Sequence, residues 1–147
     1  MQTLLKTEGR IGLESLHTHI RIPFKIDDEK AEITVNYSYS PKKYTGSDAY
    51  QQAYEAFRLS YPADEVISKA VVERELPLNN HITFSLEKDG VLLGTAHRHS
   101  PQNVFKIGEK EASYGFYPQK LLPGTYYAVL SVHAILEDVD YSLEVLA

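Results

Sequence analysis

The stretch from His81 to Val91, HITFSLEKDGV, decides the fold class of this chain. Apolar residues occupy every second position from Ile82 to Leu86, which is the pattern of a β-strand with one buried face. Asp89-Gly90 follows the strand, and this dipeptide is typical of a two-residue hairpin turn because both of its residues adopt positive φ. The stretch therefore predicts a strand that turns back as an antiparallel hairpin.

The same alternation recurs on both sides of this hairpin. It covers residues 16–22, 31–40 and 138–145, whereas residues 126–136 are apolar almost throughout, as in a central strand. Six to eight short strands predict an all-β fold, an antiparallel β-sandwich of jelly-roll type. The residues expected in its core include Phe84, Leu86, Leu130, Val132, Tyr141 and Leu143.

One segment has a helical pattern instead. Its aromatic residues recur at helical spacing, at Tyr50, Tyr54, Phe57 and Tyr61. We expect a helix with Ser47 as its N-cap, Pro62 as its end and its tyrosines as a buried stripe. A second short helix is expected over residues 63–72. The chain is thus predicted to be one sandwich domain, residues 1–147, with a helical insert at about 47–72.

Composition excludes several classes of protein. The chain has no cysteine, which rules out disulfide scaffolds, thiol nucleophiles and cysteine-based zinc sites. Its net charge of −5 is unfavourable for binding nucleic acid or an anionic membrane. No apolar run approaches the roughly 20 residues that span a bilayer, and residues 1–12 are too polar for a signal peptide. We therefore expect a cytoplasmic protein.

Four of the six histidines form two His-x-His pairs, His17 with His19 and His97 with His99. Alternate residues of a strand share a face, so each pair places two imidazoles side by side, as zinc sites on strands do. If the pairs meet on neighbouring strands, they supply three or four nitrogen ligands for a zinc ion. If they do not meet, they are solvated positions on the outer face of the sandwich.

A tyrosine cluster is the second candidate site, since tyrosine suits both sugar stacking and protein interfaces. Its ligand-binding candidates surround the segment that leads into the last hairpin, and they are Tyr114, Tyr117, Tyr126 and Tyr127. These rings either line a pocket or close one end of the sandwich.

No complete catalytic set is present in the sequence. A Gly-x-Ser-x-Gly nucleophile elbow and a glycine-rich phosphate loop are both missing. Carboxylate pairs such as Asp27-Asp28 and Glu137-Asp138 have the character of solvated turns. We therefore expect a protein that is not an enzyme and needs no cofactor, with zinc as the one cofactor that the histidines leave open.

Several runs along the chain are similar to runs in a known family. They are His19–Phe24, Ile33–Tyr39, Leu78–Leu86, Asp89-Gly90, Gly94–Arg98, Ala112–Tyr117, Leu121–Tyr126, Val132–Ile135 and Asp140–Val145. Together they resemble a bacterial β-sandwich domain that precedes the catalytic domain in some metal-dependent phosphoesterases of the polymerase-and-histidinol-phosphatase (PHP) superfamily. The resemblance extends from about His17 to Val145. Tyr114 stands where the family has proline, and Tyr126 stands where it has tryptophan.

This resemblance implies a fold and an accessory role, and it transfers no catalytic residue. In that family a catalytic domain with its own metal centre follows this module, and we expect no counterpart of it within these 147 residues. We expect a non-catalytic accessory module that acts through a protein partner or as a homodimer. The alternatives are a jelly-roll module that binds carbohydrate or another small ligand, and a small metalloenzyme built on the four paired histidines.

Overall fold

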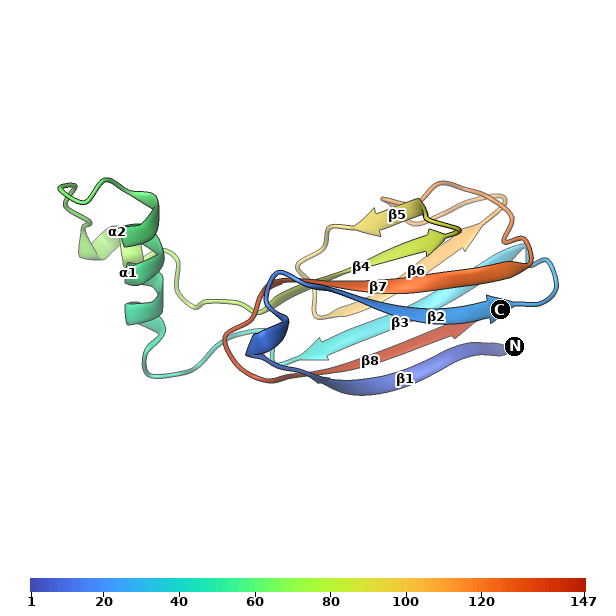
Figure 1. The fold of residues 1–147 in the computed structure, drawn as a ribbon, viewed down its shortest axis with the longest axis horizontal. Coiled ribbons are helices and arrows are strands. Elements are labelled where there is room, and N and C mark those ends of the chain that lie inside the picture. The colour runs from blue at the N-terminus through green and yellow to red at the C-terminus, as the bar shows by residue number, and fades with distance from the viewer.

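Eight strands form two four-stranded antiparallel sheets that pack face to face (Figure 1). This computed structural model describes all residues from Met1 to Ala147. The strands are β1 (Thr3–Ile11), β2 (His19–Ile26), β3 (Glu32–Ser40), β4 (His81–Lys88), β5 (Val91–Ala96), β6 (Gln102–Gly108), β7 (Gly124–Ala134) and β8 (Val139–Leu146). A short 3-10 helix, Leu13–Ser15, joins β1 to β2. The prediction of an all-β fold with a small helical insert is confirmed.

The strand order is that of a jelly roll. One sheet has the order β1-β8-β3-β6 and the other has the order β2-β7-β4-β5. The pairs β4–β5, β3–β6, β2–β7 and β1–β8 are nested, as in one long hairpin that has been rolled up. The pairs β3–β8 and β4–β7 then join the two halves of the roll within each sheet.

The predicted hairpin turn lies at the centre of this roll, between β4 and β5. Asp89 has φ 52° and Gly90 has φ 76°, so both residues adopt the left-handed conformation that a tight hairpin turn needs. Nothing lies within 4 Å of a Cβ placed on Gly90, so its backbone conformation alone favours glycine there.

The core lies between the two sheets as one cluster of 23 buried residues. Phe84 is at its centre, with the rings of Phe105, Tyr37 and Phe116 around it. Five of the six predicted core residues are buried. Tyr141 is the exception and is only half-buried, because its ring lies across Gly9 of β1, which has no side chain to cover it.

The helical insert, α1 (Ala49–Ser60) and α2 (Lys69–Glu73), projects from one end of the sandwich (Figure 1). Two details of its prediction are wrong. The N-cap of α1 is Asp48 rather than Ser47, and its carboxylate accepts hydrogen bonds from side chains, Tyr44 and Gln52, instead of capping the backbone. The second helix begins only at Lys69, because Ser68 caps it by accepting from the Val71 N–H.

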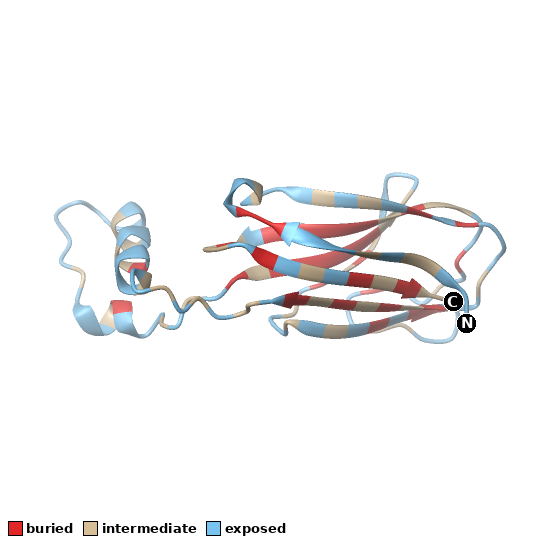
Figure 2. Cartoon of the chain, turned by 90° about the horizontal axis from the view of Figure 1, so that it is seen from below, coloured by how far each residue is buried: buried red, intermediate tan, exposed pale blue.

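The prediction that the tyrosines of α1 form a buried stripe is also wrong. Ala53 and Val72 are the only buried residues of the two helices, and Figure 2 shows the rest of the insert largely exposed. Tyr50 and Tyr61 belong to the exposed class, and Tyr54 and Phe57 are half-buried. The stripe stays open because the helices contact each other and stand clear of both sheets. Neither helix is long and apolar enough to cross a membrane.

A two-stranded neck carries the insert. The Tyr44 N–H donates to the Leu78 carbonyl at 2.8 Å, and the Asn80 N–H donates to the Lys42 carbonyl at 2.8 Å. The fully buried Asn80 side chain anchors this neck: its amide donates to the Pro41 carbonyl at 3.0 Å and its oxygen accepts from the Leu136 N–H at 2.8 Å. Both chain termini lie at the opposite end of the sandwich (Figure 1).

Candidate functional site

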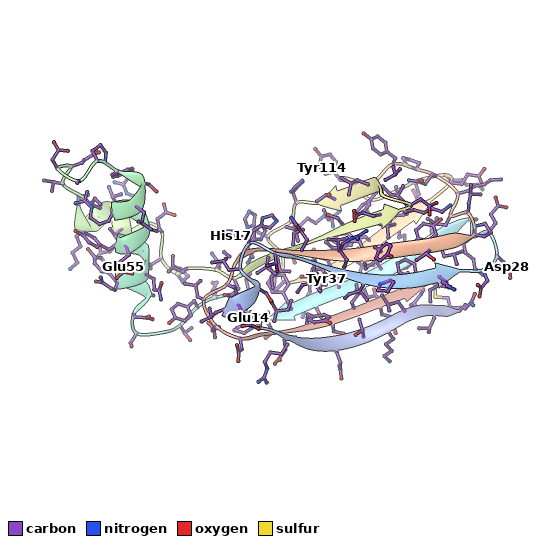
Figure 3. The ribbon with its side chains drawn as sticks, in the orientation of Figure 1. Glu14, His17, Asp28, Tyr37, Glu55 and Tyr114 are labelled. Atoms are coloured by element: carbon purple, nitrogen blue, oxygen red, sulfur yellow. The ribbon has the colours of Figure 1, made fainter.

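All six histidines of the chain lie at one end of the β2-β7-β4-β5 sheet. They stand at the beginning of β2 and β4 and at the end of β7 and β5, as His17, His19, His81, His97, His99 and His133. Because neighbouring strands of this sheet are antiparallel, the beginnings of β2 and β4 lie beside the ends of β7 and β5, at one end of the sheet. Figure 3 shows His17 at the end of the sandwich from which the insert departs.

Strand register arranges these histidines in two rows across the sheet. His19 pairs with Ser131, which pairs with Thr83, and extending the β4–β5 register by one residue places His97 next. The following row, which we call the histidine row, is made of His17, His133, His81 and His99. Its imidazole centroids are 5.3 Å apart between His81 and His133 and 4.2 Å apart between His81 and His99.

Two buried hydroxyl groups hold two of the imidazoles. A hydrogen bond of 2.8 Å joins His19 Nδ1 to Ser131 Oγ, and another of 2.8 Å joins His133 Nε2 to Thr83 Oγ1. Thr83 and Ser131 are themselves buried although they face outward from the sheet. These hydrogen bonds fix one nitrogen of each ring and leave the other nitrogen for a ligand.

Burial and the neighbouring positive groups keep the centre of the histidine row neutral. Burial, followed by the charges of His99 and Lys42, lowers the pKa of His81 to about 4. Burial also lowers the pKa of His133, with a further contribution from His19. The Nδ1 atom of His81 is buried and has no hydrogen-bond partner. The row therefore holds an unsatisfied polar atom as well as two imidazoles that resist protonation.

A groove crosses the outer face of the sheet beside the histidines. Its first part, with a volume of about 410 Å³, has His19, His97 and His133 around a floor that includes Thr83 and Ser131. Its second part, of about 520 Å³, is reached through residues shared by both parts, namely Leu92, Thr95 and His97. Both volumes fall in the range of roughly 300–1,000 Å³ that is common for small-ligand sites.

Two of the four predicted tyrosines lie in the second part of this groove. Tyr114 is 92% exposed and Tyr117 is 75% exposed, so their rings are available to a ligand. Figure 3 shows Tyr114 beside β5. The structure thus brings predicted members of both candidate sites together, because the tyrosines and His97 line the same hollow.

The other two tyrosines do not line the groove. Tyr126 is buried in the core, stacked on Phe24 at 5.6 Å, and its hydroxyl donates to the Leu122 carbonyl. Its assignment as a ligand-binding residue is therefore wrong, because alternation along β7 turns it inward. Tyr127 is half-buried and its ring is covered by the Arg21 guanidinium, 4.2 Å from the ring centroid. It flanks the groove without lining it.

The two His-x-His pairs do not meet directly. One pair precedes and begins β2 and the other follows β5, and these are the two edge strands of the sheet, with β7 and β4 between them. His133 and His81 fill this interval, and neither was among the predicted ligands. With the side chains as they stand, no three histidine or carboxylate groups are placed to hold a metal ion.

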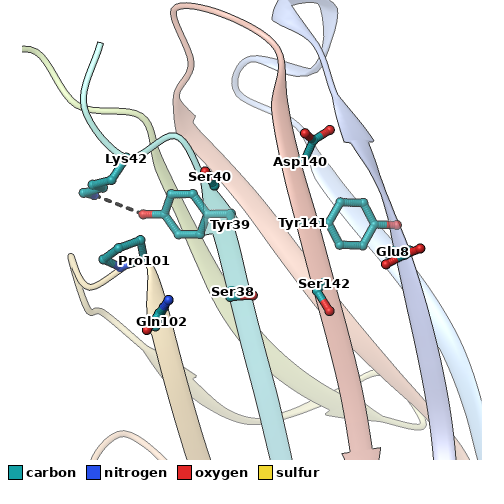
Figure 4. Close-up of a pocket in the computed structure, with 10 residues that line it drawn as sticks. All are labelled: Glu8, Ser38, Tyr39, Ser40, Lys42, Pro101, Gln102, Asp140, Tyr141 and Ser142. Atoms are coloured by element: carbon teal, nitrogen blue, oxygen red, sulfur yellow. Dashed lines mark hydrogen bonds between the residues drawn. The ribbon is translucent and has the colours of Figure 1, made fainter. Parts of the chain in front are cut away.

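A second polar hollow lies on the other sheet (Figure 4). Several of its polar side chains already have partners: Lys42 Nζ donates to the Tyr39 hydroxyl at 3.0 Å, and Asp140 accepts from Arg10 at 3.3 Å. The hollow contains no exposed aromatic platform comparable to Tyr114. We therefore regard the groove on the β2-β7-β4-β5 sheet as the candidate site.

Comparisons of the chain with protein-family models, with curated proteins and with solved structures found no match. The groove and the histidine rows are thus interpreted from their own geometry.

Proposed function

We propose that this protein is a non-catalytic jelly-roll module that binds a carbohydrate-like ligand in the groove. The observation that supports this function is that one groove contains both two exposed tyrosine rings, Tyr114 and Tyr117, and a floor of hydroxyl and imidazole groups. A sugar has an apolar ring face and a rim of hydroxyl groups. Tyrosine rings match the first of these surfaces, and hydroxyls and imidazoles match the second.

Arg21 and Glu87 add a planar pair of charged groups to the same groove. The Arg21 Nε donates to Glu87 Oε2 at 3.4 Å, and both residues line the first part. A guanidinium offers several donors in one plane and a carboxylate offers two acceptors. Side by side they suit two adjacent hydroxyl groups of one sugar ring, which each need a donor and an acceptor.

The same groove favours binding over hydrolysis. Glycosidases use two carboxyl groups on opposite sides of the bond that they cleave. Glu87 is the only carboxylate among the residues that line the groove, and it is paired with Arg21. We therefore propose an accessory role beside another protein's activity. The sequence resemblance implies such a role, since the similar module accompanies the catalytic domain of some PHP-type phosphoesterases.

Glycan-array screening followed by calorimetric titration of each hit tests this function. We expect at least one glycan to bind, and we expect the double substitution Tyr114→Ala with Tyr117→Ala to lower its affinity at least tenfold. Tyr50→Ala on the insert is the matched control and should leave the affinity unchanged, because that ring lies far from the groove. An array without hits, or equal affinities in all three proteins, would contradict the proposal.

Self-association through the insert is a second candidate function. Leu59 and Val66 are 90% and 91% exposed, and the insert buries only two residues of its own. A second copy presents the same apolar surface and fits a symmetric dimer. Light scattering coupled to gel filtration should show a dimer that Leu59→Asp converts to a monomer. A monomer at every concentration of the unmodified chain would exclude this function.

A further inference from the structure

Of the histidine row only His133 lines the groove, and the geometry of the row as a whole points to another ligand. Three neighbouring strands, β7, β4 and β5, bring His133, His81 and His99 together at one end of the sheet. Their ring centroids follow the strand spacing, at 5.3 Å and 4.2 Å. No carboxylate takes part in these contacts.

We propose that His81, His99 and His133 bind one transition-metal ion of the zinc, copper or nickel class. Imidazole nitrogen is a preferred ligand of these ions, whereas calcium and magnesium require oxygen ligands. A site made of three imidazoles with a further position for water matches the composition of known zinc sites. The metal site adjoins the proposed carbohydrate site, because His133 also lines the groove, whereas His81 and His99 lie outside its lining.

Two features of the row prepare it for a metal ion. The buried Nδ1 atom of His81 has no hydrogen-bond partner, and coordination would satisfy it. Thr83 Oγ1 holds Nε2 of His133 at 2.8 Å, which leaves Nδ1 of that ring as the ligand atom. A metal-binding imidazole usually has its second nitrogen fixed in this way by a hydrogen bond.

Coordination requires a limited rearrangement of the side chains. Metal–nitrogen bonds of about 2.0–2.1 Å place two ligand nitrogens roughly 3.3 Å apart, whereas the rings of His81 and His99 now stack 14° from parallel. His99 is exposed, and exposed side chains change rotamer within nanoseconds. The ion would therefore draw the exposed ring of His99 toward His81 and His133, which the sheet and the Thr83 hydroxyl hold in place.

Titration of the untagged protein with Co²⁺ and Zn²⁺ tests the proposal. Co²⁺ binding is followed by its visible absorption, and Zn²⁺ binding is followed by calorimetry. We expect one ion per chain, with imidazole nitrogens shown as ligands by ¹⁵N chemical shifts. Substituting His99→Gln, which changes an exposed residue and leaves the core intact, should lower the affinity at least tenfold. The same loss is expected for His81→Gln, with circular dichroism as the check on folding.

Two further variants test whether the metal ion binds at these three histidines or merely to any imidazoles of the chain. Thr83→Val keeps all six imidazoles but removes the hydrogen bond that orients His133, so the affinity should fall by about tenfold. His19→Gln removes an imidazole of the other row and should leave the affinity unchanged. Absence of binding for both metals, or equal affinities in the unmodified protein and His99→Gln, would overturn the proposal. A loss in His19→Gln as large as that in His99→Gln would overturn it as well.

Discussion

The imidazole rings of His81 and His99 lie face to face, 4.2 Å apart and 14° from parallel. His81 is the inner member of this pair, since it begins β4 and is half-buried, whereas His99 is exposed. A proton on His81 would be poorly solvated and would face the charge of His99 and of Lys42. The contact therefore links the protonation of one imidazole to the stability of this end of the sandwich.

Acidification should destabilise the protein through His81. The pKa of this imidazole is about 4 in the folded chain, compared with 6.5 for an unperturbed histidine. Between these values the unfolded chain binds more protons than the folded one, so the free energy of unfolding falls as the pH is lowered through this window. His81→Asn should flatten the dependence of the melting temperature on pH between about 6.5 and 4. Parallel curves for the two proteins would show that His81 is not the group responsible.

Asn80 should be far more important for stability than its neighbour Asn79. Replacing Asn80 by alanine leaves the Pro41 carbonyl and the Leu136 N–H without their partner, and each unsatisfied buried group costs about 1–3 kcal/mol. We expect a loss of about 3 kcal/mol in urea unfolding. Asn79→Ala removes one exposed contact to the Pro77 carbonyl and should change stability by less than about 0.5 kcal/mol. Similar losses in both variants would contradict the anchoring role.

Phe84→Ala should come close to unfolding the sandwich. This ring contacts Tyr37, Phe105 and Phe116 at the centre of the core, and truncating a buried phenylalanine costs about 3–5 kcal/mol. Val91→Ala in the same hairpin is the control, because Val91 is 60% exposed and should change stability by no more than about 0.5 kcal/mol. Chemical denaturation of the two variants compares them directly. A loss below 1 kcal/mol for Phe84→Ala would mean that the sheets do not pack as described.

Gly115→Ala should damage the groove while Gly90→Ala should spare it. Both glycines have positive φ, 99° and 76°, so alanine strains the backbone at each by about 1–2 kcal/mol. Only at Gly115 would the new Cβ also meet another atom, the Thr95 carbonyl oxygen at 2.2 Å, which forces the loop carrying Tyr114 and Tyr117 away from β5. Binding of the glycan found on the array should therefore fall in Gly115→Ala and persist in Gly90→Ala. Unchanged binding in both variants would place the ligand elsewhere.

Much of the fold could be predicted because strand alternation and turn chemistry are local. The hairpin at Asp89-Gly90 and the central strand β7 follow directly from neighbouring residues. The insert was predicted as a helix for the same reason. What covers a helix, however, depends on residues far away in the sequence, so the exposure of Tyr50 and Tyr61 could not be predicted from their spacing.

The candidate site was predicted only in part, and the missing residues show why. His97, Tyr114 and Tyr117 were selected because they stand out in the sequence as pairs or clusters. His81 and His133 are single histidines, and their importance arises from strand register, which joins β4 to β7. Alternation did contain a usable signal, since His133 follows the inward-facing Val132 and therefore faces outward. The same alternation along β7 turns Tyr126 into the core and its neighbour Tyr127 outward.

The nested pairing of the strands has a consequence for how fast the chain folds. β4 and β5 are joined by two residues, whereas β1 and β8 pair Thr3 with Leu146. Closing such distant contacts is slow, because chain entropy is lost before the contacts form. We expect the central hairpin to form early and the outer pairs to add in order, with β1–β8 last. Substitutions in β1 should then chiefly accelerate unfolding, while substitutions in the central hairpin should chiefly slow folding.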